Sequence, residues 1–299
     1  MTNAPDALGQ ADHHAGIILF DDQQLQAQAW FQSLRDQLCA AFEALEDEGT
    51  GSAPAGRFAR TAWERPDPSG APGGGGVMSV MKGRVFEKVG VNTSTVHGTF
   101  SPEFAKTIPG ADADPRFFAT GISLVAHMAN PHVPAVHMNT RFLVTTKRWF
   151  GGGADLNPAL PVAADTADFK TAFKATCDAH GDGYYERFDK WCDEYFYVPH
   201  RGRHRGVGGI FYDYLGDDFD ADFAFTQAVG RTLLATFPML VRRHMHDAFT
   251  ADERLAQLRY RGLYAEFNLV YDRGTLFGLK TGGNVDAILM SLPPEARWD

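Results

Sequence analysis

The sequence is poor in the features that mark secreted and membrane proteins. Its 299 residues include only three cysteines, Cys39, Cys177 and Cys192, which are too few and too scattered for a disulfide framework or for the spacing of a zinc finger. No apolar run approaches the ~20 residues that cross a membrane. Residues 1–10 lack the basic start and apolar centre of a secretory signal. We therefore expect reduced, mostly buried thiols, no membrane span and a cytoplasmic location.

The chain also lacks a basic excess, since its formal net charge is −9. Nucleic acids and anionic membranes are bound through basic faces, so neither is expected as a partner. The glycine-rich stretches Gly73–Gly76 and Gly206–Gly209 do not have the form of a phosphate loop: the first lacks the following lysine, and the second leads into a strand. A small anionic ligand stays compatible, because it needs only a local group of arginines.

Hydrophobic residues make up 44% of the chain, which is enough to bury a sizeable core. Strand patterns come in consecutive groups and helical patterns in pairs, which predicts an α+β fold with a large, mostly antiparallel sheet rather than an alternating α/β fold. We expect residues 1–20 to form a flexible tail and residues 21–299 to form a single catalytic domain.

The expected elements are predicted from hydrophobic periodicity, turn residues and caps. Helices are predicted over Asp22–Glu48, Asp165–His180, Tyr184–Tyr197, Phe219–Met245, Ala251–Gly262 and Val285–Leu292. Strands are predicted over Phe58–Trp63, Val77–Met81, Val85–Val89, Val91–His97, Ile122–Met128, Ala135–Thr145 and Gly206–Tyr214. Loops are predicted over Pro66–Gly76 and Gly151–Pro158, and a last hairpin is predicted to join Tyr264–Tyr271 to Thr275–Lys280.

Several histidines lie where they could act near neutral pH. His127 and His137 lie on two β-rich stretches and could face one another across the sheet. His132 lies in the proline turn between them, where an exposed polar role is favoured, and His200 follows a tyrosine-rich helix. A histidine can act as a general acid or base or as a metal ligand. For His127 and His137 a functional role and a purely structural one both stay open.

Polar residues alternate along the second of these stretches. His137, Asn139 and Arg141 would point to one face of a strand. An acid or base, an amide and a guanidinium on one face suit a ligand that carries carboxylates, because arginine can grip a carboxylate through two hydrogen bonds. The alternative is an edge strand with a solvated polar face.

Two segments combine glycine with charge. The glycines of 150–158 allow the backbone to approach a ligand closely and could bring Asp155 to it, although Asp155 could equally cap the next stretch of the chain. The stretch 201–209 holds Arg201, Arg203 and Arg205 before a glycine-rich strand. It is either an anion site or an exposed basic loop.

The segment Glu266–Thr275 combines charge and apolar residues most sharply. If it is a strand, the side that carries Glu266, Asn268 and Asp272 is too polar for a plain core. The dipeptide Asp272-Arg273 could still be only a turn with a local salt bridge. Residues 281–284 then open a short helix, whose free N–H groups favour an anion.

Taken together, these segments resemble the oxygen-dependent coproporphyrinogen-III oxidases of the bacterial soluble type. The similarity runs from about Phe58 to Trp298. The segments that carry it are Gly73–Gly76, Gly90–Asn92, Val96–Gly98, Asn130–Pro134, His137–Arg141, Trp149–Pro158, Lys190–Tyr197, Arg205–Asp213 and Tyr264–Gly283.

The resemblance implies a large antiparallel sheet flanked by helices on both faces, assembled as a homodimer through the C-terminal region. It also implies an oxidative decarboxylation in haem biosynthesis, in which two propionates of coproporphyrinogen III become the vinyl groups of protoporphyrinogen IX. Dioxygen would be the electron acceptor, and carbon dioxide and hydrogen peroxide would leave. No redox cofactor is then required, because the reduced macrocycle supplies the electrons.

The resemblance further assigns roles to individual residues. His137 matches the position of a proton donor, and Asp272 is expected to deprotonate a pyrrole while Asp155 engages another pyrrole N–H. Arg273 would hold the reacting propionate. Further contacts with the substrate are expected from Ser123, Asn139, Thr140, Arg141, Arg205, Gly282, Gly283 and Asn284.

Two departures from the family pattern concern metal and anion binding. Relatives often carry a histidine set that matches His127, His137 and His200, but the fourth position is Lys170, whose protonated amine has no lone pair for a metal. We therefore expect a divalent metal to be non-essential. Asn284 stands where relatives can have arginine, which weakens one propionate contact.

Two alternative functions stay open from the sequence. A metal-dependent hydrolase or oxygenase would use the same histidines and would require bound metal. A non-catalytic tetrapyrrole-binding protein would hold the ligand without consuming oxygen.

Overall fold

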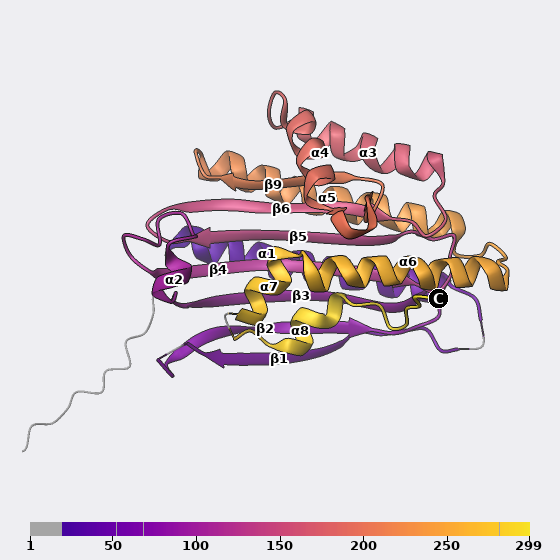
Figure 1. Cartoon of the computed structure of the whole chain (residues 1–299), viewed down its shortest axis with the longest axis horizontal. Coiled ribbons are helices and arrows are strands. Elements are labelled where there is room, and N and C mark those ends of the chain that lie inside the picture. Colours follow the sequence, from indigo (N-terminus) through magenta and orange to yellow (C-terminus); the bar gives the residue numbers. More distant parts are fainter. Residues whose placement is uncertain (1–19, 52, 68, 281) are drawn as a thin grey trace, which may run out of the picture.

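One seven-stranded antiparallel sheet forms the centre of the structure (Figure 1). The computed structural model describes residues 20–51, 53–67, 69–280 and 282–299. The strand order is β1-β2-β3-β4-β5-β6-β9. The strands are β1 Ala59–Pro66, β2 Pro72–Met81, β3 Phe86–Thr99, β4 Arg116–Met128, β5 Ala135–Val144, β6 Arg148–Asn157 and β9 Gly209–Leu215, with a separate small pair of β7 Tyr197–Val198 and β8 Arg203–His204.

Helices cover both faces of the sheet, as Figure 1 shows, so the expected α+β architecture is confirmed. α1 and α5 lie on one face, and α6, α7 and α8 lie across the other. The helices of the described residues are α1 Asp22–Glu48, α2 Pro102–Ala105, α3 Ala163–Asp178, α4 Tyr184–Tyr195, α5 Phe219–His244, α6 Ala251–Val270, α7 Arg273–Lys280 and α8 Val285–Ile288, with 3₁₀ turns at Pro199–Arg201 and Leu289–Ser291.

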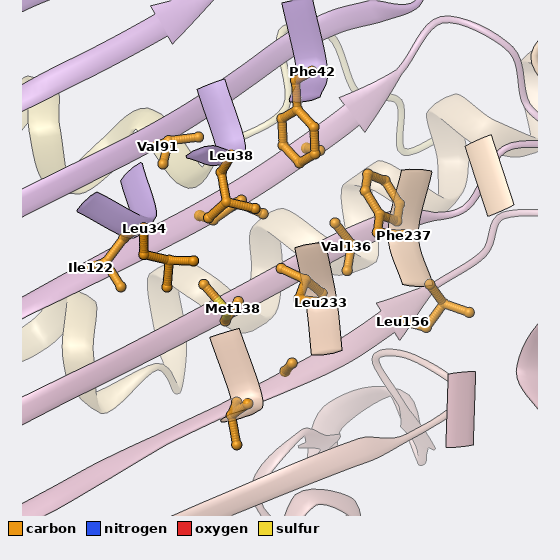
Figure 2. Close-up of a cluster of buried hydrophobic side chains, with 14 of the residues drawn as sticks. Leu34, Leu38, Phe42, Val91, Ile122, Val136, Met138, Leu156, Leu233 and Phe237 are labelled. Atoms are coloured by element: carbon orange, nitrogen blue, oxygen red, sulfur yellow. The ribbon is translucent and has the colours of Figure 1, made fainter. Parts of the chain in front are cut away.

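The main core fills the space between the sheet and the pair α1 and α5 (Figure 2). Leu34, Leu38 and Phe42 recur every fourth residue of α1, so one face of the helix is fully buried. They meet Leu233 and Phe237 of α5 and the inward residues of the central strands. Each such side chain stabilises the fold by roughly 1.5–3 kcal/mol through burial alone.

Strand β5 shows how the sheet separates core from site. Met138 and Thr140 are buried on the side of α1 and α5, whereas His137, Asn139 and Arg141 point to the other face and are partly exposed. The predicted common face of these three residues is therefore confirmed. The side chain of Thr140 lies on the core side, so the backbone is the part of this residue that lies near the site.

Several predicted boundaries around glycine are wrong. Gly151–Pro158 is not a loop, because Arg148–Asn157 forms β6, which is almost entirely buried. Pro66–Gly76 is a loop only in part, since β2 begins at Pro72. The two short strands predicted within 85–97 are one continuous strand, β3. Glycine carries no strand signal of its own, and here the sheet hydrogen bonds on both sides override its weak propensity.

The predicted hairpin at the C-terminus is also wrong. Tyr264–Tyr271 forms the last turns of α6, and Thr275–Lys280 lies in α7. Phe267 and Asn268 lie three and four residues after Tyr264, and all three are buried, which is the spacing of one face of a helix. The same stretch also alternates over a few residues, which is why it suggested a strand. Thr250 and Glu253 form a capping box that starts this helix.

Three further expectations concern the whole chain. The three cysteines are free and buried, as predicted. Among the described residues, none of the helices combines the length and the apolar character that a membrane crossing demands. The tail predicted for residues 1–20 lies outside the described residues apart from Phe20, which contacts Phe118 in the sheet.

Candidate active site

The candidate site occupies the face of the sheet that lies under α6, α7 and α8. Ser123 of β4 pairs with Asn139 of β5, and His137 of β5 pairs with Asp155 of β6, so their side chains share this face. His127 lies on the same face but does not pair with His137, because Val125 occupies that register position. The expectation that the two histidines lie directly opposite each other is therefore wrong.

A histidine, a carboxylate and a guanidinium form a chain that leads into the core. His137 Nδ1 lies 2.8 Å from Asp155 Oδ1, and Arg205 donates from one nitrogen to both oxygens of Asp155 at 2.8 Å. Asp155 is 1% exposed, whereas His137 is 19% exposed. A carboxylate at Nδ1 favours a proton there, so Nε2 is the ring nitrogen left for a ligand.

Burial of Asp155 favours its neutral form, but the charge of Arg205 and the hydrogen bond to His137 outweigh burial and lower the pKa of Asp155 to about 2. The same ion pair outweighs the cost of burying Arg205 and raises the pKa of that guanidinium above its ordinary value. Both groups are therefore charged at neutral pH.

Arg205 lies in an aromatic box. Its guanidinium stands 4.1 Å from the ring centre of Phe196 and 4.7 Å from that of Phe267, and it donates to Asn268 Oδ1 at 2.9 Å. The side chain is 2% exposed. The structure thus pairs the charges of Arg205 and Asp155 with each other in the core. The expected contacts of Arg205 with a propionate and of Asp155 with a pyrrole N–H stay predictions.

The guanidinium of Arg141 is accessible on the site face of the sheet. It is 30% exposed and donates to Asp213 of β9 at 2.7 Å. This pair lies over Gly151, where a Cβ atom would come within 2.3 Å of an oxygen of Asp213. Any larger residue at Gly151 would displace the pair, so this glycine is required by close approach. The sequence did not single out Asp213 as the partner of Arg141.

The second charged group lies at the junction of α6 and α7. Asp272 accepts hydrogen bonds from Thr275 N at 2.7 Å and from Thr275 Oγ1 at 2.8 Å, which is the pattern of a helix N-cap. Its other oxygen accepts from the hydroxyl of Tyr195 at 2.8 Å. Arg273 is exposed, with its guanidinium over the ring of Tyr195. Tyr195 lies inside the family motif, but the sequence alone does not predict its contact with Asp272.

The stretch after α7 caps the next helix. Asn284 Oδ1 accepts from Ala287 N at 2.9 Å, so it fills the position that an anion was expected to take at the start of α8. Gly282 has φ +71, which explains why glycine is favoured there. Gly283 is held against Gly278 by a backbone hydrogen bond of 2.9 Å.

The three histidines considered as metal ligands have separate partners. His127 is buried, which lowers its pKa to about 3, and its Nε2 contacts Ser291 O at 2.9 Å. His200 contacts Glu266 and Tyr271, while Lys170 pairs with Asp189. Within the described ranges, no group of three or more His, Cys, Asp or Glu side chains could hold a metal ion. The residues present therefore do not fit the metal set of the family.

The fold and the site give the class of the protein. It is an α+β protein with a histidine that a carboxylate holds and an accessible arginine on one sheet face, and with an Asp-Arg pair in the helices that cover this face. The family is narrower. The chain belongs to the coproporphyrinogen III oxidase family, whose model matches residues 26–299.

Curated relatives agree with this assignment. The oxygen-dependent coproporphyrinogen-III oxidase of Rickettsia bellii (strain RML369-C) is 57% identical over 274 residues, covering 90% of this chain and 96% of the relative. The proteins of the same name from Rickettsia rickettsii (strain Sheila Smith) and Rickettsia akari (strain Hartford) are each 56% identical, over 91% and 90% of this chain and 96% of each relative.

Proposed function

We propose that this chain is an oxygen-dependent coproporphyrinogen-III oxidase, which converts coproporphyrinogen III to protoporphyrinogen IX. The observation that carries the proposal is that His137 and Arg141 share one sheet face, to which Tyr195 and Phe211 link the Asp272-Arg273 pair, in a chain 56–57% identical to relatives of that name. A substrate with propionates and pyrrole N–H groups needs both guanidinium and carboxylate partners.

The conversion of one propionate to a vinyl group balances in atoms and electrons without a redox cofactor. The carboxylate leaves as carbon dioxide, and the carbon next to the pyrrole loses one hydrogen with two electrons, so a vinyl group forms. One dioxygen accepts the two electrons and, with that hydrogen and one further proton, leaves as hydrogen peroxide.

The proposed roles depend on what each group can reach. Asp272 takes a pyrrole proton, which makes the ring electron-rich towards dioxygen, and Arg273 holds the reacting propionate. Arg141, with Ser123 and Asn139 beside it, binds a second carboxylate. His137 exchanges a proton through Nε2, and Asp155 keeps its ring oriented.

The test is a steady-state assay of coproporphyrinogen conversion, followed by porphyrin fluorescence, with and without oxygen. Asp272→Ala should lower kcat by about 10²- to 10⁴-fold, the range for loss of a general base. The control Asp178→Ala removes an exposed carboxylate paired with Lys174 and should leave turnover unchanged. Near-normal turnover of Asp272→Ala would eliminate its role. Tight binding of the substrate without oxygen consumption by the wild type would indicate a binding protein instead.

We further propose that the reaction needs no bound metal. The poor fit of His127, His137 and His200 to a common ion supports this. Chelator-treated protein shown by elemental analysis to be metal-free should keep full turnover. Loss of activity that a divalent ion restores would instead support a metal-dependent oxygenase.

A homodimer through the C-terminal region is supported by an exposed apolar surface on α6, α7 and α8. Leu269, Val270, Leu279 and Val285 are each 40–55% exposed there, and such patches are typical of interfaces. Light scattering should give twice the chain mass for the wild type and a monomer for Val270→Asp. A wild-type monomer would contradict the proposal.

A cytoplasmic location is a further proposal, which the free, buried cysteines support. Cell fractionation would check it.

A further inference from the structure

Tyr195 of α4 contacts both members of the Asp272-Arg273 pair. Its hydroxyl donates to Asp272 Oδ1 at 2.8 Å and accepts from the backbone N–H of Arg273 at 3.1 Å. The guanidinium of Arg273 lies 5.0 Å from the centre of the same ring. One side chain, distant in sequence, therefore holds the carboxylate, the peptide N–H and the guanidinium of the α6–α7 junction together.

The position of this hydroxyl is set by the sheet. The ring of Tyr195 stacks on Phe211 of β9, with ring centres 4.2 Å apart and an interplanar angle of 12°, and it meets Phe196 edge-on at 4.9 Å. Phe211 lies in the register row of Gly153 and Asn139, on the site face. A rigid aromatic stack thus ties the helical junction to β9, in the same sheet whose strand β5 carries Asn139 and His137.

The contact also directs the lone pairs of Asp272. Thr275 occupies one carboxylate oxygen with two hydrogen bonds, and Tyr195 occupies one side of the other. A carboxylate oxygen accepts in two directions, so Oδ1 retains one direction for a ligand N–H. A carboxylate without the tyrosine hydroxyl could rotate about its terminal torsion, which has broad preferences.

We infer that Tyr195 is a positioning residue, which aims Asp272 at the pyrrole N–H and holds Arg273 beside it. The inference rests on the proposed function for its catalytic meaning, but not for the geometry. Tyr195 does not touch the reacting atoms and acts through its two partners. Its loss should affect turnover more than binding, because the ring that supports the Arg273 guanidinium remains in a phenylalanine variant.

Two helices and one charged residue of the core surround Asp272. Tyr195 of α4 and Thr275 of α7 donate hydrogen bonds to its carboxylate, and the charge of Arg205 acts on it from the core. A hydrogen bond donated to a carboxylate stabilises its charged form. Removing the hydroxyl of Tyr195 therefore takes away one of the contacts that stabilise and orient this carboxylate.

The experiment compares wild type, Tyr195→Phe and the matched control Tyr185→Phe. Tyr185 lies on the same helix, and its hydroxyl lies 3.5 Å from Asp189, away from the junction. We expect Tyr195→Phe to lower kcat about tenfold, as small misplacements of reacting groups do, with KM little changed. Tyr185→Phe should match the wild type in both kcat and KM.

A second readout does not depend on activity. Amide hydrogen exchange of the peptide over residues 271–278 should be faster in Tyr195→Phe than in the other two proteins, because the Arg273 N–H loses its acceptor. Equal exchange, or a loss that falls on KM while kcat stays unchanged, would overturn the positioning role. If the wild type converts no coproporphyrinogen, the proposed function fails, and the exchange result alone then decides whether Tyr195 holds the junction.

Discussion

The two halves of the candidate site differ in how firmly they are held. The strand-borne half, His137 with Asp155 and Arg205, lies on β5, β6 and the segment before β9, and its two charged members are 1% and 2% exposed. The helix-borne half, Asp272 with Arg273, lies at the junction of α6 and α7, and Arg273 is exposed. One half is buried among strands and the other borders the surface.

This difference teaches which contacts are obligatory. A buried carboxylate must keep its cation, because an unpaired charge in the core costs several kcal/mol. Asp155 therefore has little freedom, and His137 inherits a fixed orientation from it. Asp272 instead accepts hydrogen bonds from Thr275 and Tyr195, each worth about 1 kcal/mol. The strand-borne half thus orients one ring through a buried ion pair, whereas the helix-borne half is held by hydrogen bonds at the border of the surface.

The largest test of this contrast replaces Arg205 with methionine. Arg205→Met leaves Asp155 buried without its cation and should lower the free energy of unfolding by about 3–5 kcal/mol. Urea denaturation measures this loss. The control is Arg201→Met, because Arg201 is 49% exposed in its pair with Glu266 and should matter far less. Equal losses in the two variants would contradict the contrast.

The pH dependence of the free energy of unfolding tests the same contrast between the two halves. The pKa of folded Asp155 is about 2, below the ordinary value of 3.8. Its contribution is therefore fully present above about pH 4 and is lost as the pH falls through about 2; the shift corresponds to about 2 kcal/mol. The difference in unfolding free energy between wild type and Asp155→Asn should shrink over this window. A constant difference would show that Asp155 is not held charged by Arg205.

The smallest expected effect falls on the helix-borne half. Thr275→Val keeps the shape of a side chain that is 6% exposed but removes its hydroxyl from Asp272, and should cost about 1 kcal/mol. Hydrogen exchange should rise within α7 only. The control Thr166→Val removes a similar hydroxyl bond at the start of α3 and should leave α7 unaffected. A loss as large as that of Arg205→Met would mean that both halves are equally constrained.

One member of the strand-borne half, His137, was placed correctly from the sequence. The alternation of His137, Asn139 and Arg141 placed them on one face, because successive side chains of a strand point to opposite sides. The partners of these residues were not predictable. Asp155 was placed in a loop, since glycines gave no strand signal. The burial of Arg205 was not predicted, because it depends on Phe196 and Phe267 from other elements.

The helix-borne half was misjudged for a different reason. The apolar and polar residues of 264–272 alternate over a short window, and such a window fits a strand and a helix equally until the preceding turns are included. The long helix from the cap at Thr250 decides the matter. Its consequence is that Asp272 caps α7 rather than standing in a hairpin turn.

The sequence by itself determined the fold class, the common face of the β5 residues, the buried free cysteines and the motifs that mark the family. These are local or cumulative properties, written in periodicity and residue type. Only the tertiary structure decided which charges are paired with each other and which are accessible. The bonds that settle this join residues far apart in the chain, 50 positions for Arg205 and Asp155 and 77 for Tyr195 and Asp272, and no local pattern specifies a contact over such a separation.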